Sequence, residues 1–200
     1  MVTDIAAKGA RAVAVQADVS DSAQLRSLFD AAEREFGGLD AVVSNVGVAR
    51  FARLAEATDE DFDLVFNTNT RATFVALREA ANRVRDGERI VVISSGAAVT
   101  SRVAGGVYGA SKAAGDALVR SAAKELGPRG ITVNSVLPGA TRTDALAAGM
   151  SEEREAQTVA QTPLRRLGEP DDIADVVSFV VSGDARWITG QALYAAGGLF

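Results

Sequence analysis

Residues 89–95 read RIVVISS, and this run decides the fold. Its consecutive apolar side chains, without alternation, are typical of a strand whose two faces are both covered by helices. Such strands are found in parallel sheets. Similar runs predict four more strands, at 12–19, 39–45, 131–139 and 191–198.

Segments with helical periodicity separate these strands. One helix is predicted between an N-terminal cap at Asp21 and the Gly37-Gly38 pair. Others are predicted at 59–85, at 107–126 and from Pro170 onward. This alternation predicts an α/β fold, a Rossmann-like, doubly wound parallel sheet in three α/β/α layers. No linker or repeat divides the chain, so we expect a single domain over residues 1–200.

The composition excludes several kinds of chemistry. The 200 residues contain no His and no Cys, so a Ser-His-Asp triad, a Cys nucleophile and a conventional zinc site are ruled out, and we expect no metal. The net charge of −5 argues against nucleic acid and anionic membranes as partners. No apolar run is long enough to span a bilayer, and the N-terminus lacks the pattern of a signal peptide, so the expected location is the cytoplasm.

Small and polar residues gather where the predicted strands end. In doubly wound sheets the ligand crevice lies outside the carboxyl ends of the strands. The residues at those ends are Asp18-Val19, Ser44-Asn45, Ser94-Ser95 and Pro138-Gly139. This distribution predicts a binding site along that edge of the sheet.

Two residues next to this edge can perform acid–base chemistry together. In VYGASKA (107–113), Tyr108 and Lys112 are four residues apart and share a helix face. An ammonium near a phenol stabilises the phenolate, so the pair can give or take a proton, although the same spacing is common among surface residues. Ser95 ends a buried strand, where its hydroxyl either caps a turn or contacts a substrate carbonyl.

Asn69 lies on the apolar stripe of the helix predicted at 59–85. A buried amide without partners costs on the order of 1–3 kcal/mol, so its side chain must be hydrogen-bonded. The partner is either structural backbone or a water that serves the site.

Six segments together resemble the short-chain dehydrogenase/reductase family, close to its 3-oxoacyl-carrier-protein reductase and glucose dehydrogenase branches. They are ADVSD, SNVG, FNTNT, YGASK with Ser95 thirteen residues before its Tyr, VNSVLPGATRT, and RRLGEPDDIADVVSFVVS with ITGQALYAAGG. The resemblance covers essentially all 200 residues. It departs from the family pattern at Ser44, Val46, Ala72 and Ala196, and none of these changes removes a catalytic group.

The resemblance implies an oxidoreductase that transfers hydride between NAD or NADP and a small-molecule carbonyl or alcohol. Tyr108 would be the general acid and base, Lys112 would lower its pKa and bind the nicotinamide ribose, and Ser95 would polarise the carbonyl. Asn69 would hold a water that links Lys112 to solvent. The residues implied to contact the cofactor, besides Tyr108 and Lys112, are Asp18, Val19, Asn45, Gly47, Pro138, Gly139, Thr141 and Thr143.

The family's glycine-rich loop, which holds the pyrophosphate at a helix N-terminus, has no counterpart in the 200 residues. The resemblance begins at the end of the family's second helix, so the first strand, that loop and the second strand are expected to be lacking. Cofactor affinity is therefore expected to be weak. Three explanations are open: an incomplete copy of a normal enzyme, a shortened homologue in which 12–18 pairs directly with 39–45, or a silent scaffold whose crevice binds a ligand or partner without catalysis.

The family also implies a homodimer or homotetramer, assembled through the helices at 59–85 and 107–126. Residues 142–168 correspond to its variable substrate lid. The mixture of Ala, Met and charged residues in this segment selects no particular substrate.

Overall fold

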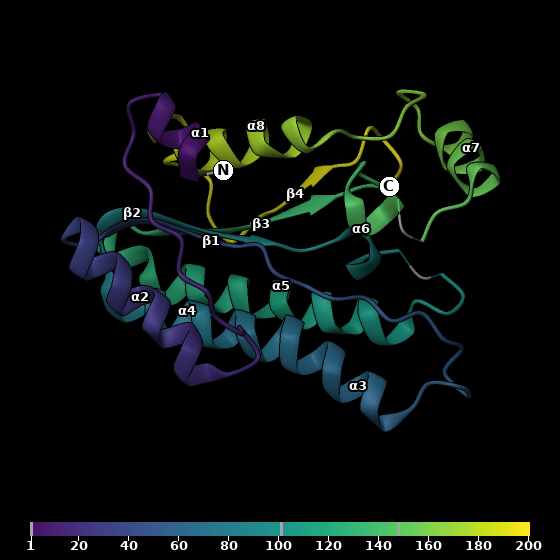
Figure 1. Ribbon diagram of the computed structural model, residues 1–200, viewed down its shortest axis with the longest axis horizontal. Coiled ribbons are helices and arrows are strands. Elements are labelled where there is room, and N and C mark those ends of the chain that lie inside the picture. Colours follow the sequence, from purple (N-terminus) through teal and green to yellow (C-terminus); the bar gives the residue numbers. More distant parts are fainter. Residues whose placement is uncertain (1, 101, 148) are drawn as a thin grey trace.

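The computed structural model describes residues 2–100, 102–147 and 149–200. Figure 1 shows a sheet between two layers of helices, with α8 (Pro170–Val181) on one side and α2 (Ser22–Phe36), α4 (Ala72–Arg83) and α5 (Gly106–Leu126) on the other. Four parallel strands form the sheet, in the order β1 (Leu39–Ser44), β2 (Val84–Ile93), β3 (Thr132–Pro138) and β4 (Ala192–Ala195). The predicted Rossmann-like parallel sheet with flanking helices is therefore confirmed.

Helices cover both faces of the central strands, which is why their sequences lack alternation. Val91 of β2 and Val133 and Val136 of β3 are each 0% exposed. One hydrophobic cluster lies between the sheet and α2, α4 and α5, and a smaller one around Val180 lies between the sheet and α8. Burying a Val side chain completely contributes about 1.5–3 kcal/mol, so these strands position the edge of the sheet firmly.

The helix boundaries follow local signals. Asp21 accepts hydrogen bonds from the backbone N–H groups of Ala23 and Gln24, and Gly37, at φ 79°, ends α2 as predicted. A capping box of Glu169 and Asp172 starts α8. None of the described helices is long and apolar enough to cross a membrane.

The helix predicted at 59–85 is not one continuous α-helix. α3 (Asp59–Val65) runs into a π-helical segment at Phe66–Arg71, which leads into α4. The helix then ends at Arg83, because β2 starts at the next residue. π-Helical turns are uncommon and often accompany functional sites. This one contains Asn69.

The strand predicted at 12–19 is absent, and that prediction was wrong. Residues 10–18 have no regular secondary structure and cross from α1 (Val2–Ala7), beside α8, past the sheet to α2 (Figure 1). Val13 is 50% exposed and Val15 43% exposed. A strand needs a hydrogen-bonded neighbour for its N–H and C=O groups, and among the described residues β1 pairs with β2 alone. Direct pairing of 12–18 with 39–45 is therefore not found.

Two short helices form the segment that resembles a substrate lid, α6 (Asp144–Ala147) and α7 (Glu152–Gln161). Arg142 connects this segment to its surroundings. Its Nη2 atom lies 2.7 Å from Glu155 Oε1, and its Nε atom lies 3.2 Å from Glu169 Oε1, at the start of α8. Arg142 thus connects this segment to the start of the helix that covers one face of the sheet.

Candidate active site

Ser95 lies just beyond β2, at the carboxyl end of the sheet. Its Oγ accepts a hydrogen bond from the backbone N–H of Ala97, 3.2 Å away, and so caps the short 3-10 turn Gly96–Ala98. Because the hydroxyl acts here as an acceptor, its proton remains free to donate into the space in front of the sheet. The N–H of the preceding Ser94 donates to the Val136 carbonyl at 2.8 Å, which holds this strand end against β3.

Tyr108 lies in the first turn of α5, and a glycine brings that turn close to Ser95. At Gly109, a Cβ atom would come within 2.5 Å of the Ala97 carbonyl oxygen, closer than side chains approach backbone. The first turn of α5 therefore packs directly on the turn that Ser95 caps. Tyr108 is half-buried, and its ring packs edge-on against Phe51 with 5.7 Å between the ring centroids.

Lys112 lies one turn further along α5, and only 9% of its surface is exposed. Its Nζ donates a hydrogen bond to the carbonyl of Ile93, the last residue of β2, at 2.9 Å. Burial lowers the pKa of the ammonium to about 8, while the negative charge of Asp116 acts in the opposite direction. Gly47 leaves room for the ammonium, because a Cβ atom there would lie 3.0 Å from Lys112 Nζ.

The Asn69 side chain is 3% exposed and fully hydrogen-bonded. Its Oδ1 accepts from the Val48 N–H at 2.9 Å, and its Nδ2 donates to the Val48 carbonyl at 2.9 Å and to Ser111 Oγ at 3.0 Å. The sequence predicted either structural backbone or a water as the partner of this amide. The partners in the structure are backbone groups of Val48 and the side chain of Ser111. Asn69 therefore fixes the loop after β1 against α5, and its water-holding role stays a prediction.

Asp116 lies a further turn along α5, with 6% of its surface exposed. Its Oδ2 accepts a hydrogen bond from Ser94 Oγ at 3.0 Å. Burial raises the pKa of this carboxyl, whereas the hydroxyls of Ser135 and Ser94 and the charges of Arg120 and Lys112 lower it. Although Ser135 lies beside the carboxylate, neither Asp116 Oδ1 nor Ser135 Oγ makes a hydrogen bond of normal geometry with a described residue.

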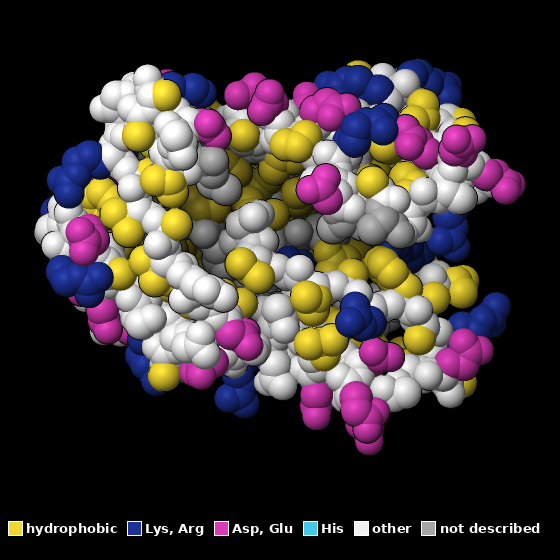
Figure 2. All heavy atoms as spheres, in the orientation of Figure 1, with side chains coloured by type: hydrophobic (Ala, Val, Ile, Leu, Met, Phe, Trp, Pro, Cys, Tyr) yellow, Lys and Arg dark blue, Asp and Glu magenta, His cyan; other side chains and the backbone are white. Residues whose placement is uncertain are grey.

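Ser95, Tyr108 and Lys112 line one cavity of about 1130 Å³. Figure 2 shows this side of the molecule hollowed between α8 and the layer of α2, α4 and α5, with hydrophobic side chains in the hollow. The cavity carries the charges of Lys112 and Arg102, and its described lining contains no Asp or Glu. The arrangement offers two hydroxyl groups and a cation next to an apolar space.

Most of the residues predicted to contact a cofactor also line this cavity: Asn45, Gly47, Pro138, Gly139, Thr141 and Thr143. Asp18 and Val19 do not. The Asp18 carboxylate instead accepts hydrogen bonds from the N–H and the hydroxyl of Ser20, at 2.9 and 2.7 Å, which lower its pKa. The structure therefore brings together the residues predicted from β1, β2 and β3 and leaves those of the 10–19 segment outside.

The lining fits the nicotinamide and ribose part of a dinucleotide. Lys112 supplies a cation, and the Thr143 hydroxyl accepts from the Leu146 N–H at 3.2 Å, so its proton remains free for a ligand. No carboxylate is present to repel an anionic cofactor in the described lining. A pyrophosphate, however, needs a glycine-rich turn between a strand and a helix, and no such turn occurs among the described elements.

Four residues near the reacting groups were missed by sequence reasoning. Asp116 could have been found, because it lies four residues after Lys112 on the same helix face. Phe51, Arg102 and Phe200 line the cavity from loops and carry no motif. The ring of Phe200 lies over Gly96, where any Cβ atom would come within 2.1 Å of it.

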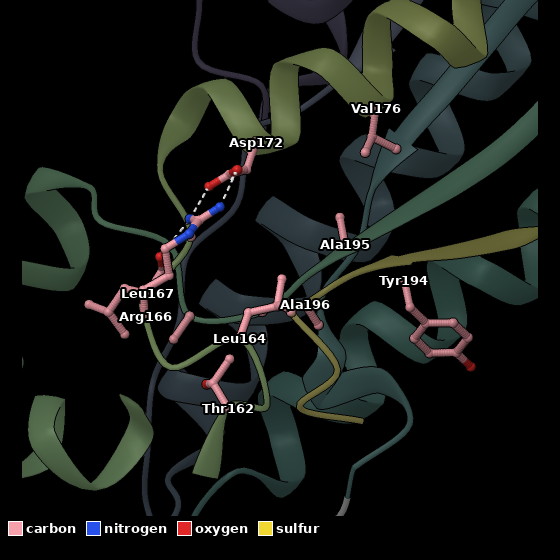
Figure 3. Close-up of a pocket in the computed structure, with 13 residues that line it drawn as sticks. Thr162, Leu164, Arg166, Leu167, Asp172, Val176, Tyr194, Ala195 and Ala196 are labelled. Carbon is pink, nitrogen blue, oxygen red and sulfur yellow. Dashed lines mark hydrogen bonds and ion pairs between the residues drawn. The ribbon is translucent and has the colours of Figure 1, made fainter. Parts of the chain in front are cut away.

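A smaller cavity of about 190 Å³ shares Gly139 and Ala140 with the large one. Figure 3 shows Arg166 and Asp172 pointing toward each other at its wall, joined by contacts of 2.5 and 2.7 Å. The Arg166 guanidinium holds the pKa of the Asp172 carboxyl well below its usual range. Because these two charges neutralise each other, we do not assign catalysis to this cavity. No cluster of His, Cys, Asp or Glu suited to a metal occurs in the described part of the chain.

Comparisons with known proteins identify the family that the whole chain resembles. Residues 1–200 match the family described as Enoyl-(Acyl carrier protein) reductase. An uncharacterised oxidoreductase of Methylorubrum extorquens is 43% identical over 201 residues, which cover 100% of this chain and 81% of the relative. A short-chain dehydrogenase from Burkholderia cenocepacia, solved in complex with NADP, is 39% identical with a TM-score of 0.93 over 99% of this chain and 80% of that one. A 7α-hydroxysteroid dehydrogenase, solved with NADH and 7-oxo glycochenodeoxycholic acid, is 33% identical with a TM-score of 0.93 over 98% of this chain and 78% of that one.

Proposed function

The chain belongs to the short-chain dehydrogenase/reductase family, and we propose that it interconverts a carbonyl and a secondary alcohol, with Tyr108 as general acid and base. The observation that carries this proposal is the meeting of Ser95, Tyr108 and Lys112 in one cavity at the carboxyl ends of the parallel strands. Packing of the core does not require these three polar groups to lie together. A reaction that moves a proton does.

The proposed cofactor is a nicotinamide dinucleotide, which supplies or accepts a hydride when bound. Its support is the presence of NADP and of NADH in the two solved relatives described above. Lys112, Asn45 and Thr143 are the groups proposed to hold its nicotinamide end, because they line the cavity with Tyr108. The charge of Lys112 and the free hydroxyl proton of Thr143 suit a ribose and a phosphate.

The proton steps follow from the positions of the side chains. In reduction, the Tyr108 hydroxyl gives its proton to the carbonyl oxygen, and the free Ser95 hydroxyl proton donates a hydrogen bond to the same oxygen. The Lys112 ammonium stabilises the phenolate that remains on Tyr108. Since the pKa of Lys112 is lowered to about 8, this residue can also pass a proton onward near neutral pH. Oxidation of an alcohol uses the same transfers in reverse.

A silent form of the fold is the second candidate. In this form the cavity would bind a ligand or partner without turnover. Under this alternative Ser95, Tyr108 and Lys112 persist as polar lining only.

Deuterium transfer separates the two candidates. The protein is incubated with aryl ketones and millimolar NADPH or NADH in which both hydrogens at C4 of the nicotinamide are replaced by deuterium. The proposal expects a secondary alcohol with deuterium on the carbinol carbon, detected by mass spectrometry. Unlabelled or absent alcohol, in a preparation whose circular dichroism shows a folded protein, would support the silent form.

A titration with NADPH and NADH by calorimetry measures what the 200 residues contribute to cofactor binding. We expect dissociation constants weaker than millimolar, because no backbone cradle for the pyrophosphate occurs in the sequence. Sub-millimolar binding would contradict this expectation and would locate the missing contacts within the described elements.

We also propose that the protein is located in the cytoplasm and that it self-associates. Phe62 and Phe66 stack with 4.2 Å between their ring centroids on α3 and the π-helical segment, and Phe62 is 45% exposed. Phe74 on α4 is equally exposed. An apolar surface of this kind is suited to packing against a second copy, as a homodimer or homotetramer.

A further inference from the structure

The charge of the large cavity differs in sign from the charge of the chain. The sequence has 26 acidic and 21 basic residues, for a net charge of −5. The described lining of the cavity nevertheless includes two cations, Arg102 and Lys112, and no carboxylate. A site with this lining attracts anions and disfavours cations, because Asp116, the carboxylate beside Lys112, is buried outside the lining and no carboxylate faces Arg102 from the described lining.

The two cations have different surroundings. Lys112 lines the cavity but is buried, and its ammonium donates a hydrogen bond to the Ile93 carbonyl. Arg102 is exposed, and its guanidinium makes no ion pair or hydrogen bond with another described residue. By contrast, Arg50 and Arg142 pair with carboxylates, at 3.7 Å from Asp61 and 2.7 Å from Glu155. The N–H groups of the Arg102 guanidinium are therefore available to donate hydrogen bonds to a ligand.

A single aromatic ring separates Arg102 from the proposed acid. The Arg102 guanidinium lies 4.5 Å from the centroid of the Phe51 ring, and Phe51 in turn packs edge-on against Tyr108 at 5.7 Å. A guanidinium over an aromatic ring is held in place and can still bind a carboxylate or phosphate through two N–H groups. The lining of the same cavity also includes apolar side chains, among them Phe51, Leu146, Met150, Leu199 and Phe200.

We infer that the substrate is a carbonyl compound, or the corresponding alcohol, with an apolar body about one ring long and an anionic group at its far end, which Arg102 binds. The reacting carbon would lie at Tyr108 and Ser95, the apolar body against Phe51, and the carboxylate or phosphate at Arg102. This inference rests on the proposed function only for the identity of the reacting group. The anion site is inferred from the charges and the lining of the cavity alone.

Binding measurements test the anion site without requiring turnover. 4-Acetylbenzoate, 4-acetylphenyl phosphate and the neutral 4-acetylbenzamide have the same aryl ketone and differ in charge. Calorimetry or ligand-observed NMR at low ionic strength should show at least one anionic ketone binding roughly 10-fold or more tightly than the amide, as expected for a charge-assisted pair. The better of the two anions distinguishes a carboxylate from a phosphate as the group recognised.

Three variants assign the preference to Arg102. Arg102→Gln should abolish the preference for the anion and leave binding of the amide unchanged, whereas Arg102→Lys should retain part of it. Arg53→Gln removes an exposed arginine that does not line the cavity and should change nothing. NADPH affinity should be equal in the native protein and in Arg102→Gln, because Arg102 is assigned to the substrate.

The inference is overturned if both anionic ketones bind no better than the amide, or if the preference survives in Arg102→Gln. Absence of binding by all three ketones overturns it as well. Failure of the proposed function gives a different result, in which the anion preference is present and no deuterium reaches the carbinol carbon.

Discussion

The carboxyl ends of β2 and β3 and the segment 10–18 differ in how many neighbours their backbone has. β2 pairs with β1 and β3, and β3 pairs with β2 and β4, so both strands are hydrogen-bonded on two sides. Segment 10–18 has no strand partner among the described residues. Ser95 follows one of the paired strands and lines the cavity, whereas Asp18, at the end of the unpaired segment, does not.

The difference shows what positions a site in this fold. The residues that follow a strand are held in place when that strand is hydrogen-bonded to a neighbour, because backbone pairing sets the position and direction of the strand. The elements β2, β3 and α5 hold Ser95, Tyr108 and Lys112 in place. The contacts that do so, described above, are formed between described residues. The predicted cofactor contacts of Asp18 and Val19 lack such support.

The largest expected effect comes from disturbing the contact between α5 and the strand end. Gly109→Ala places a Cβ atom 2.5 Å from the Ala97 carbonyl oxygen, so α5 must move and Tyr108 moves with it. We expect turnover to fall about 100-fold, since a misplacement on the order of 1 Å has that effect, and stability to fall by about 1–3 kcal/mol. Initial rates of ketone reduction and urea unfolding measure the two losses.

Gly115→Ala is the matched control on the same helix, where the nearest atom to an added Cβ is 3.7 Å away. It should leave turnover unchanged and stabilise α5 by up to about 1 kcal/mol, because Ala favours a helix interior. Similar turnover for both variants would show that the close approach of α5 does not position Tyr108.

Lys112 gives a prediction in the pH dependence of stability. Burial lowers its pKa in the folded protein from 10.5 to about 8. Between these two values the unfolded chain holds a proton that the folded chain has released, so stability rises with pH in this window. The burial cost is present in full below pH 8 and is relieved by about pH 10.5, a change on the order of 3 kcal/mol.

Lys112→Met should lack this rise, and Lys124→Met, which changes an exposed lysine of the same helix, should keep it. Urea unfolding at a series of pH values from 7 to 11 in roughly half-unit steps measures the difference between the variants. Parallel curves for the native protein and Lys112→Met would mean that the ammonium is not buried in solution.

The smallest effect is expected in the unpaired segment. Val133→Ala, in β3, should destabilise the fold by about 2 kcal/mol, because this side chain is 0% exposed and its removal leaves a cavity. Val13→Ala should change stability by less than about 0.5 kcal/mol, since Val13 is 50% exposed. Equal losses would show that segment 10–18 packs as a strand after all.

Much of the site could be predicted because its local signals agree with tertiary structure. The apolar run at 89–95 gave a buried strand, and Tyr108 and Lys112 share a helix face as their spacing predicted. The run at 12–19 has the same apolar character, but a strand also needs a neighbour, and periodicity carries no information about neighbours. The π-helical segment around Asn69 was beyond prediction because it depends on contacts with Val48 and Ser111, distant in sequence.

The loop residues of the cavity could not be predicted for a related reason. Arg102 and Phe51 are 51 positions apart along the chain and meet only through the packing of two irregular segments. Neither residue belongs to a repeating pattern, so neither could be placed on a face. Asp116, in contrast, lies on a regular helix four residues after Lys112, and the same spacing rule that selected Tyr108 identifies it.

The rate of ketone reduction by Tyr108→Phe, compared with Tyr194→Phe, tests the central claim most directly. The chain has two tyrosines, and Tyr194 does not line the large cavity. At millimolar NADPH we expect Tyr108→Phe to lose activity by about 10²–10⁴-fold, the usual contribution of general acid catalysis, while Tyr194→Phe keeps native turnover and both retain native circular dichroism. Native turnover in a folded Tyr108→Phe variant would contradict the assignment of Tyr108 as the acid and base.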